Sequence, residues 1–192
     1  MRHISDATIK DARHLAYLVN LAGEGMPFYF WQSMCTPGQA VIDHGTERAT
    51  RETGDFSYRN ARIHRQDGEV TSALIAFKLD DPYQIDDLET CPDYIHPLIH
   101  LEAKGPGDWY INVLAVYEPY RRQGIANILL EDSFRRGRKA ECSTTSLIVH
   151  STNEAAKQLY ENKGFSISDE LPVIPIPGTI EGGMWQRLVK KL

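Results

Sequence analysis

Apolar residues recur at helical spacing in three parts of the chain. The first segment covers residues 9–22. Thr8 and Asp11 at its start have the spacing of an acidic capping box, and Gly23 after it is a typical helix stop. The same period returns in two later segments, residues 124–138 and 153–163. We therefore predict three helices at these places.

Strand-like patterns lie between and after these helices. An alternating run at residues 56–63 and a strand-like run at residues 70–79 flank Asp67-Gly68, which is typical of an antiparallel hairpin. Further short strands are expected at residues 109–116, 147–149, 165–167 and 184–189. The order helix, hairpin, strand-helix-strand-helix-strand predicts an α/β or α+β fold, and we expect one domain over residues 1–192.

Three segments show no clear period. Residues 24–50 contain the aromatic run Phe28–Trp31, which is either core or the wall of a pocket. Residues 80–108 hold four prolines and are expected to form an irregular insertion with one short helix. Residues 170–183 form a proline-containing loop.

The composition narrows the class of protein. The chain has 192 residues, 42% hydrophobic and 24% charged, which excludes general disorder and allows a core without disulfides or metal. A net charge of −5 argues against a nucleic-acid binder. Three scattered cysteines favour a reducing compartment. With neither a secretory leader nor an apolar run of about 20 residues, we expect a soluble cytoplasmic protein without a membrane partner.

The strongest chemical signal is a hydrophobic strand that passes through a short turn directly into a helix, over residues 112–126. Backbone N–H groups at such a helix start point outward, and the helix dipole adds positive charge, so the turn can hold phosphate. The small residues Gly124 and Ala126 allow phosphate oxygens to approach the backbone closely, and Arg121 and Arg122 add cationic charge. An ordinary strand-to-helix turn with solvated arginines is the alternative. The pattern is not a Walker A loop.

The same residues resemble a known family, the GNAT superfamily of acetyl-CoA-dependent N-acetyltransferases. Its pyrophosphate signature is Gln or Arg, two residues, Gly, one residue, then Gly or Ala. The matching residues are Arg121, Arg122, Gln123, Gly124, Ile125 and Ala126. The segment from Asn153 to Phe165, with Leu159-Tyr160 and Gly164-Phe165, is similar to the family's second motif. The resemblance implies a twisted, mixed, mostly antiparallel sheet flanked by helices, with strands splayed at the coenzyme site.

The resemblance also implies roles for individual residues. The backbone of Leu114, Ala115 and Val116 is expected to bond the pantetheine arm, as an added strand would. The Arg121–Ala126 turn is expected to hold the pyrophosphate. Asn153 would lie near the thioester, and Tyr160 beside the sulfur as the candidate general acid, its alternative being a tyrosine packed in the core. The implied reaction is direct attack of a primary amine on acetyl-CoA, without a metal.

The general base departs from the family's pattern. Relatives often carry a glutamate on the central strand, but here Tyr110 and Asn112 occupy the candidate positions. Glu102, just before that strand, is the preferred substitute and Glu24 the second. A solvated Glu102 and a water chain to bulk solvent remain as alternatives.

The insertion at residues 80–108 bears on the acceptor. Seven acidic residues and no lysine or arginine lie between Lys78 and Lys104, which favours cationic amines, unless the loop is only solubilising. His96 and His100 are spaced like metal ligands, but Pro97 lies between them and no third ligand is evident, so we expect no metal site.

Two other functions remain as alternatives. One is a catalytically silent CoA-binding sensor or interaction module, and the other is an acyltransferase that uses another acyl-CoA or an acceptor oxygen. The oligomeric state stays open, a homodimer included.

Overall fold

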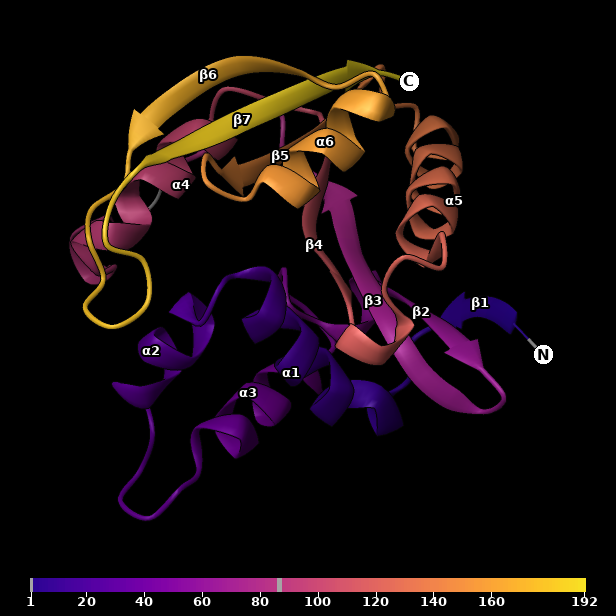
Figure 1. Cartoon of the computed structure of the whole chain (residues 1–192). Helices are drawn as coiled ribbons and strands as arrows, with labels where there is room; N and C mark the ends of the chain where they lie inside the picture. The colour runs from indigo at the N-terminus through magenta and orange to yellow at the C-terminus, as the bar shows by residue number, and fades with distance from the viewer. Residues whose placement is uncertain (1, 86–87) are drawn as a thin grey trace. The chain divides into compact units, whose positions relative to one another are not determined.

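The computed structural model describes residues 2–85 and 88–192, and its strands form one sheet. The sheet has seven strands in the hydrogen-bonded order β1-β2-β3-β4-β5-β7-β6 and is mixed but mostly antiparallel, flanked by helices (Figure 1). The predicted fold class is thereby confirmed. The chain divides into two compact units, which are described separately below. The first unit has the residues before Phe77 with Asn112–Ser133, and the second has Phe77–Ile111 with Phe134–Leu192.

The first unit contains strands β1 (Arg2–Asp6), β2 (Ala61–Gln66) and most of β3 (Glu69–Lys78), paired antiparallel. Asp67 and Gly68 both have positive φ, 51° and 90°, as a tight hairpin turn with right-handed strand twist requires. The predicted hairpin is confirmed. The strand predicted from residue 56 is wrong at its start, because Ser57 caps a 3-10 helix at Tyr58–Asn60 with its side-chain oxygen. Strand β1 was not predicted, because only Ile4 is apolar in it.

Helices α1 (Ala12–Ala22), α2 (Met26–Gln32) and α3 (Val41–Ala49) precede the hairpin in the first unit. A 3-10 turn at Ile9–Asp11 precedes α1, and the Asp11 carboxylate accepts a hydrogen bond from the Thr8 backbone N–H at 2.8 Å. Trp31 is buried against Gly45, where any Cβ would overlap the indole ring. In the aromatic run, Trp31 is therefore core, whereas Tyr29 is 39% exposed.

The second unit contains β5 (Thr144–His150), β7 (Met184–Lys191) and β6 (Ser166–Pro172), paired antiparallel in that order (Figure 1). Strand β4 (Trp109–Val116) has the predicted bounds and pairs in parallel with β5 through its first three residues. Strands β5 and β6 are longer than predicted. In β5 the polar start is buried, because Thr145 donates its hydroxyl hydrogen bond to the Trp109 carbonyl at 2.8 Å.

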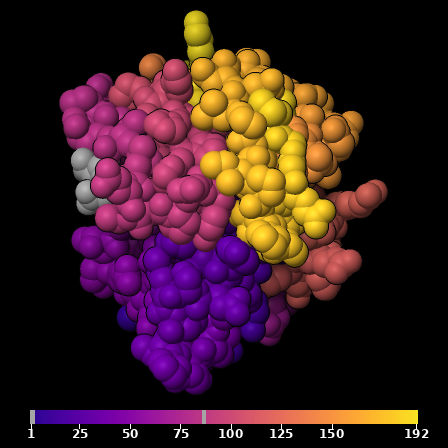
Figure 2. Space-filling view, turned by 90° about the vertical axis from the view of Figure 1, so that its left-hand side faces the viewer, coloured from indigo at the N-terminus to yellow at the C-terminus, as the bar shows by residue number. Residues whose placement is uncertain are grey.

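The helices of the second unit are α4 (His96–Glu102), α6 (Glu154–Asn162) and the C-terminal part of α5 (Ile125–Lys139), whose first residues belong to the first unit. Helix α4 is the single short helix expected in the insertion. It contacts β5, β6 and β7, and Figure 2 shows its segment beside the C-terminal one. Among the helices of the described residues, none has the length and apolarity that crossing a bilayer requires.

Candidate active site

The first unit carries the predicted phosphate turn between β4 and α5. Strand β4 ends at Val116, and Tyr117 N–H donates to the Thr71 carbonyl at 2.9 Å, which keeps the strand end on β3. A 3-10 turn at Glu118–Tyr120 follows, with Pro119 in its first residues. Helix α5 then begins at Ile125, which is buried and anchors the helix start. The sequence prediction of strand, turn and helix is confirmed here.

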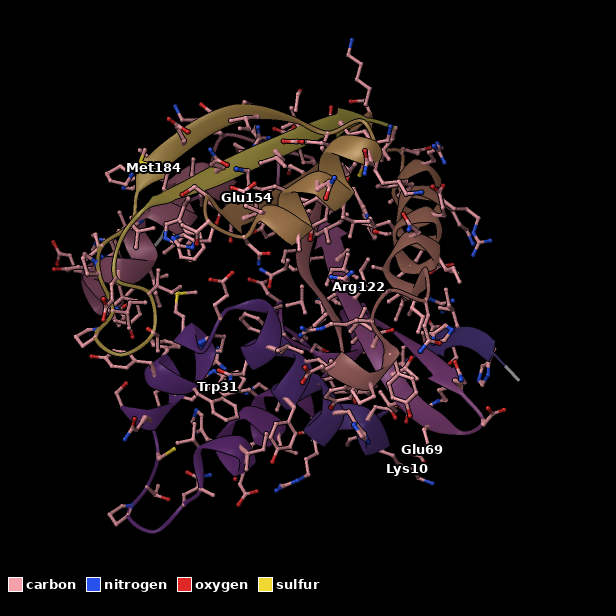
Figure 3. All side chains as sticks on the ribbon, viewed as in Figure 1. Lys10, Trp31, Glu69, Arg122, Glu154 and Met184 are labelled. Atoms are coloured by element: carbon pink, nitrogen blue, oxygen red, sulfur yellow. The ribbon has the colours of Figure 1, made fainter. Side chains whose placement is uncertain are left out.

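The turn itself has an unusual backbone. Arg122 has φ 59° and Gly124 has φ 77°, so two of three consecutive positions lie in the left-handed region. Such alternation turns successive backbone N–H groups toward one side and forms an anion-binding concavity. Arg121, Arg122 and Gly124 are exposed. Figure 3 labels Arg122 at the start of α5.

The space at Gly124 is open. A Cβ built at Gly124 would meet no atom within 4 Å among the residues described. No acidic residue lies in the first turn of α5, and its last turn carries Arg136, Arg138 and Lys139, which suits the helix dipole. The residues present therefore suit the pyrophosphate of a CoA molecule: backbone donors, a dipole and two arginines without a competing carboxylate on the helix start.

A contact that the sequence did not reveal supports the same strand end. His14 Nδ1 lies 3.0 Å from the Tyr117 hydroxyl, and burial, with a smaller contribution from Tyr17, raises the pKa of Tyr117 to about 12. Tyr117 follows the last residue of β4 directly. The only signal in the sequence was its position next to the turn, since His14 lies 103 residues away.

The second unit carries Asn153 and Tyr160 on or beside α6. Asn153 is the N-cap of α6, and its side-chain oxygen accepts a hydrogen bond from the Ala156 N–H at 3.2 Å. Tyr160 is 8% exposed and its ring packs edge-on against Phe165, with centroids 5.7 Å apart. Burial raises the pKa of Tyr160 well above its usual value, so its hydroxyl stays protonated near neutral pH. The packed and the proton-donating interpretations of Tyr160 are thus compatible.

Comparison with known proteins identifies the chain. The sequence profile of the Acetyltransferase (GNAT) family matches residues 31–165, about 70% of the chain. The chain belongs to the GNAT family of acetyltransferases. The match includes the Arg121–Ala126 turn and the segment up to Phe165. The protein is thus an acyltransferase enzyme, and the family generally uses acetyl-CoA.

Solved structures of other acetyltransferases share the fold of this GNAT enzyme. An N-acetyltransferase from Staphylococcus aureus Mu50 has 20% identity and a TM-score of 0.66, over 98% of this chain and 100% of that one. A polyamine N-acetyltransferase from Drosophila melanogaster, which forms N-acetylagmatine, has 14% identity and a TM-score of 0.69 over the whole of both chains. The Escherichia coli ribosomal-protein-S18-alanine N-acetyltransferase has 18% identity and a TM-score of 0.57, over 100% and 94%. No curated protein sequence matches this chain significantly.

The candidate bases of this GNAT enzyme lie in different units. Glu102 belongs to the second unit, at the C-terminal end of α4, and accepts a hydrogen bond from the Tyr83 hydroxyl at 3.1 Å. Glu24 belongs to the first unit, between α1 and α2, with φ 53°. At the family's usual position, Tyr110 is buried and lies edge-on to Phe77. Neither Glu102 nor Glu24 therefore comes from β4.

The acidic insertion is only partly described. Asp86 and Asp87, two of the seven acids, lie outside the described residues, whereas Asp80, Asp81, Glu89 and Asp93 are exposed. His96, on the first turn of α4 with Pro97, lies within hydrogen-bond distance of the Leu88 and Cys91 carbonyls, at 2.9 and 3.1 Å. His96 thus lies between the start of α4 and the carbonyls of Leu88 and Cys91. Over residues 2–85 and 88–192, no group of three or more His, Cys, Asp or Glu side chains is arranged to hold a metal ion.

Proposed function

We propose that this GNAT enzyme transfers an acetyl group from acetyl-CoA to a primary amine by direct attack of the amine. The observation that carries the proposal is the turn before α5, where Arg122 and Gly124 have positive φ and the space in front of Gly124 is open. A turn of this kind suits a pyrophosphate, and the chain's family membership supplies the reaction type.

The residues of the first unit would bind and orient the coenzyme. Backbone N–H groups of Gln123 to Ala126 and the cations of Arg121 and Arg122 would hold the pyrophosphate. The backbone of Leu114, Ala115 and Val116 at the end of β4 is proposed to bond the pantetheine amides, as an added strand would. Acetyl-CoA supplies the activated carbonyl and a thiolate leaving group. The chain's own residues have to position the amine, accept a proton from it, and supply a hydrogen bond or a proton to the leaving sulfur.

Tyr160 is proposed to donate a hydrogen bond to the departing sulfur. Burial favours its neutral phenol and keeps the proton on the oxygen in the resting enzyme. With a pKa raised above its ordinary value of 10, the phenol stabilises a thiolate by hydrogen bonding more readily than by full proton transfer. Asn153 is proposed to lie near the thioester, where its backbone and side chain already organise the start of α6.

The amine must lose a proton before attack, because alkyl ammonium groups are protonated at neutral pH. Glu102 is the first candidate for this base and Glu24 the second, with a water chain to solvent as the alternative to both. The hydrogen bond from Tyr83 fixes the orientation of the Glu102 carboxylate. A carboxylate held in this way can accept a proton without first changing its side-chain conformation.

We propose a cationic small-molecule amine as the acceptor. The insertion between Lys78 and Lys104 carries seven acidic residues and no basic one, which raises the local concentration of cations. Relatives in fold act on polyamines and agmatine, which are cationic amines, but also on an alanine of ribosomal protein S18. A peptide amine is therefore the second acceptor class. We further propose that the chain acts as one catalytic domain in the cytoplasm.

The binding part of the proposal is tested by calorimetric titration with acetyl-CoA. Gly124→Glu brings a side chain and a negative charge into the phosphate turn and should abolish measurable binding in a folded protein. Gly54→Glu is the matched control, because Gly54 also has positive φ, 90°, and open space around its Cβ position. Equal affinity of the two variants would remove the phosphate turn from the account.

The rival functions differ in turnover. A silent CoA-binding sensor would bind acetyl-CoA with the same dependence on Gly124 but release no free thiol with any amine. An enzyme for another acyl group or an acceptor oxygen would release thiol only with those substrates. Free-thiol release across amines and acyl-CoAs therefore separates all three.

A further inference from the structure

The end of β5 is joined to the loop between β6 and β7 by a compact set of hydrogen bonds in the second unit. His150 Nε2 lies 2.7 Å from the Gly182 carbonyl oxygen, and its Nδ1 lies 2.8 Å from the Thr152 hydroxyl. Ser151 N–H donates to the Met184 carbonyl at 2.8 Å, and Met184 N–H donates to the Ser151 hydroxyl at 3.0 Å. We call these contacts of residues 150–152 with residues 182–184 the β5 clasp.

The partners of His150 fix its tautomer. A carbonyl oxygen only accepts, so Nε2 carries the hydrogen that is donated to Gly182. The Thr152 hydroxyl then donates to Nδ1 in the neutral ring, and accepts from it when the ring is charged. His150 is 7% exposed and packs against the Trp185 ring, with centroids 5.3 Å apart. The imidazole is thus held through both nitrogens and one face.

The loop end lies directly on this imidazole because position 183 is glycine. Gly183 has φ 98°, and a Cβ there would come within 2.8 Å of His150 Nε2 and 3.0 Å of Ser151 Oγ. Any other residue would strain the backbone and separate the loop from the end of β5. The loop itself is compact, because Ile176 and Ile180 are buried and exchange backbone hydrogen bonds of 2.6 and 3.2 Å.

The clasp also holds the start of α6. Asn153 N–H donates to the His150 carbonyl at 2.9 Å, and the Lys157 ammonium donates to the Ser151 carbonyl at 3.1 Å. Figure 3 labels Glu154, the first residue of α6, and Met184, the first residue of β7. The loop before β7 and the helix with Asn153 and Tyr160 are therefore fixed to the same three residues.

We propose that His150 is a positioning residue that fixes the Val173–Gly183 loop against the turn with Asn153, and so sets where the acceptor amine lies. This inference rests on the proposed function, in which Asn153 is near the thioester. The loop is bonded to His150 and Ser151, which precede Asn153 by three and two residues. It would therefore border the thioester, which the amine has to reach. His150 acts through the Gly182 carbonyl and does not itself take the proton.

The test compares His150→Gln with His150→Leu. The Gln amide can place its N–H near the position of Nε2 and restore the bond to Gly182, whereas Leu fills the space without a donor. For Leu we expect the KM of the amine to rise about tenfold, with little change in kcat or in the acetyl-CoA Kd. In His150→Gln the KM of the amine should return most of the way to the wild-type value. Thr152→Val, which removes only the partner of Nδ1, should raise the KM of the amine less than Leu does.

Hydrogen exchange supplies a readout that needs no turnover. Amides of residues 174–182 should exchange faster in His150→Leu than in the wild type and in His150→Gln. If these amides exchange at the wild-type rate in His150→Leu, or equally fast in His150→Gln and His150→Leu, His150 does not hold the loop and the proposal is wrong. Faster exchange with an unchanged KM for the amine would overturn the positioning role while the proposed function stands. Absence of turnover in the wild type would overturn the proposed function first, and the acceptor role of His150 with it, whatever the exchange rates.

Discussion

The Nε–H of Arg121 donates a hydrogen bond to the carbonyl oxygen of Val116, 3.1 Å away. This contact joins the last residue of β4 to the turn that begins α5. The guanidinium is otherwise exposed, so the bond limits its rotation and keeps its charge beside the turn. The same arginine thus contacts the strand end proposed for pantetheine and lies in the turn proposed for the pyrophosphate.

Replacing Arg121 should weaken coenzyme binding. Arg121→Met keeps an unbranched apolar stem but removes the charge and the bond to Val116, and we expect the acetyl-CoA Kd to rise about tenfold. Arg13→Met is the control, since Arg13 is an exposed arginine of the first unit paired with Asp43. Calorimetry that gives both variants the wild-type Kd would contradict a role for Arg121 at the phosphate.

Tyr160→Phe should lower kcat more than it changes coenzyme affinity. The ring stays packed against Phe165, so folding is preserved, and only the hydroxyl that meets developing negative charge is lost. We expect a roughly 100-fold fall in kcat with the acetyl-CoA Kd within about twofold. Steady-state kinetics with normal turnover at saturating substrates would leave Tyr160 as a packing residue.

The sequence predicted those elements whose signals are local. Helix α5 and strand β4 were placed within a residue of their observed ends, because a mostly apolar strand is followed by a turn with proline and then by apolar residues at helical spacing. Strand β1 was missed, because its pairing with β2 depends on residues about 60 positions away. The polar start of β5 was missed for a similar reason, since Thr145 is stabilised by the Trp109 carbonyl of another strand.

The candidate site shows the same division. The turn before α5, which we propose binds phosphate, could be predicted from the sequence because it is formed by the six consecutive residues Arg121–Ala126. The contact between His14 and Tyr117 and the bonds of His150 with Gly182 join residues 103 and 32 positions apart, and nothing in the local pattern indicates them. The general base falls in this second class, since Glu102 and Glu24 come from segments without a motif.

The acidic insertion should select cationic acceptors. Neutralising Asp86, Asp87 and Glu89 together should raise the KM for a diamine about tenfold while leaving that for a neutral aromatic amine unchanged, and salt should shrink the difference. Neutralising the exposed Glu69, Glu141 and Glu161 gives the same change in net charge elsewhere. Equal effects of both triple variants on the diamine would show that only the total charge matters.

Tyr117 should titrate as an unusually weak acid. Its burial favours the neutral phenol, so the resulting stability is complete below pH 10, its ordinary pKa, and is lost as pH rises through about 12. The tyrosinate absorbance of the wild type minus that of Tyr117→Phe should therefore show a midpoint near 12, with folding followed by circular dichroism. A difference midpoint near 10 would mean that the strand end at Tyr117 is open to solvent.

The most direct test of the account is acetyl transfer itself. Purified protein is mixed with acetyl-CoA and a panel of primary amines: a diamine, agmatine, a neutral aromatic amine and a peptide with a free N-terminus. Free thiol and acetylated amine are measured together. We expect thiol release matched one to one by acetylated amine, strongest for the cationic amines and lost in Gly124→Glu. Acetyl-CoA binding without thiol release on any amine would contradict it.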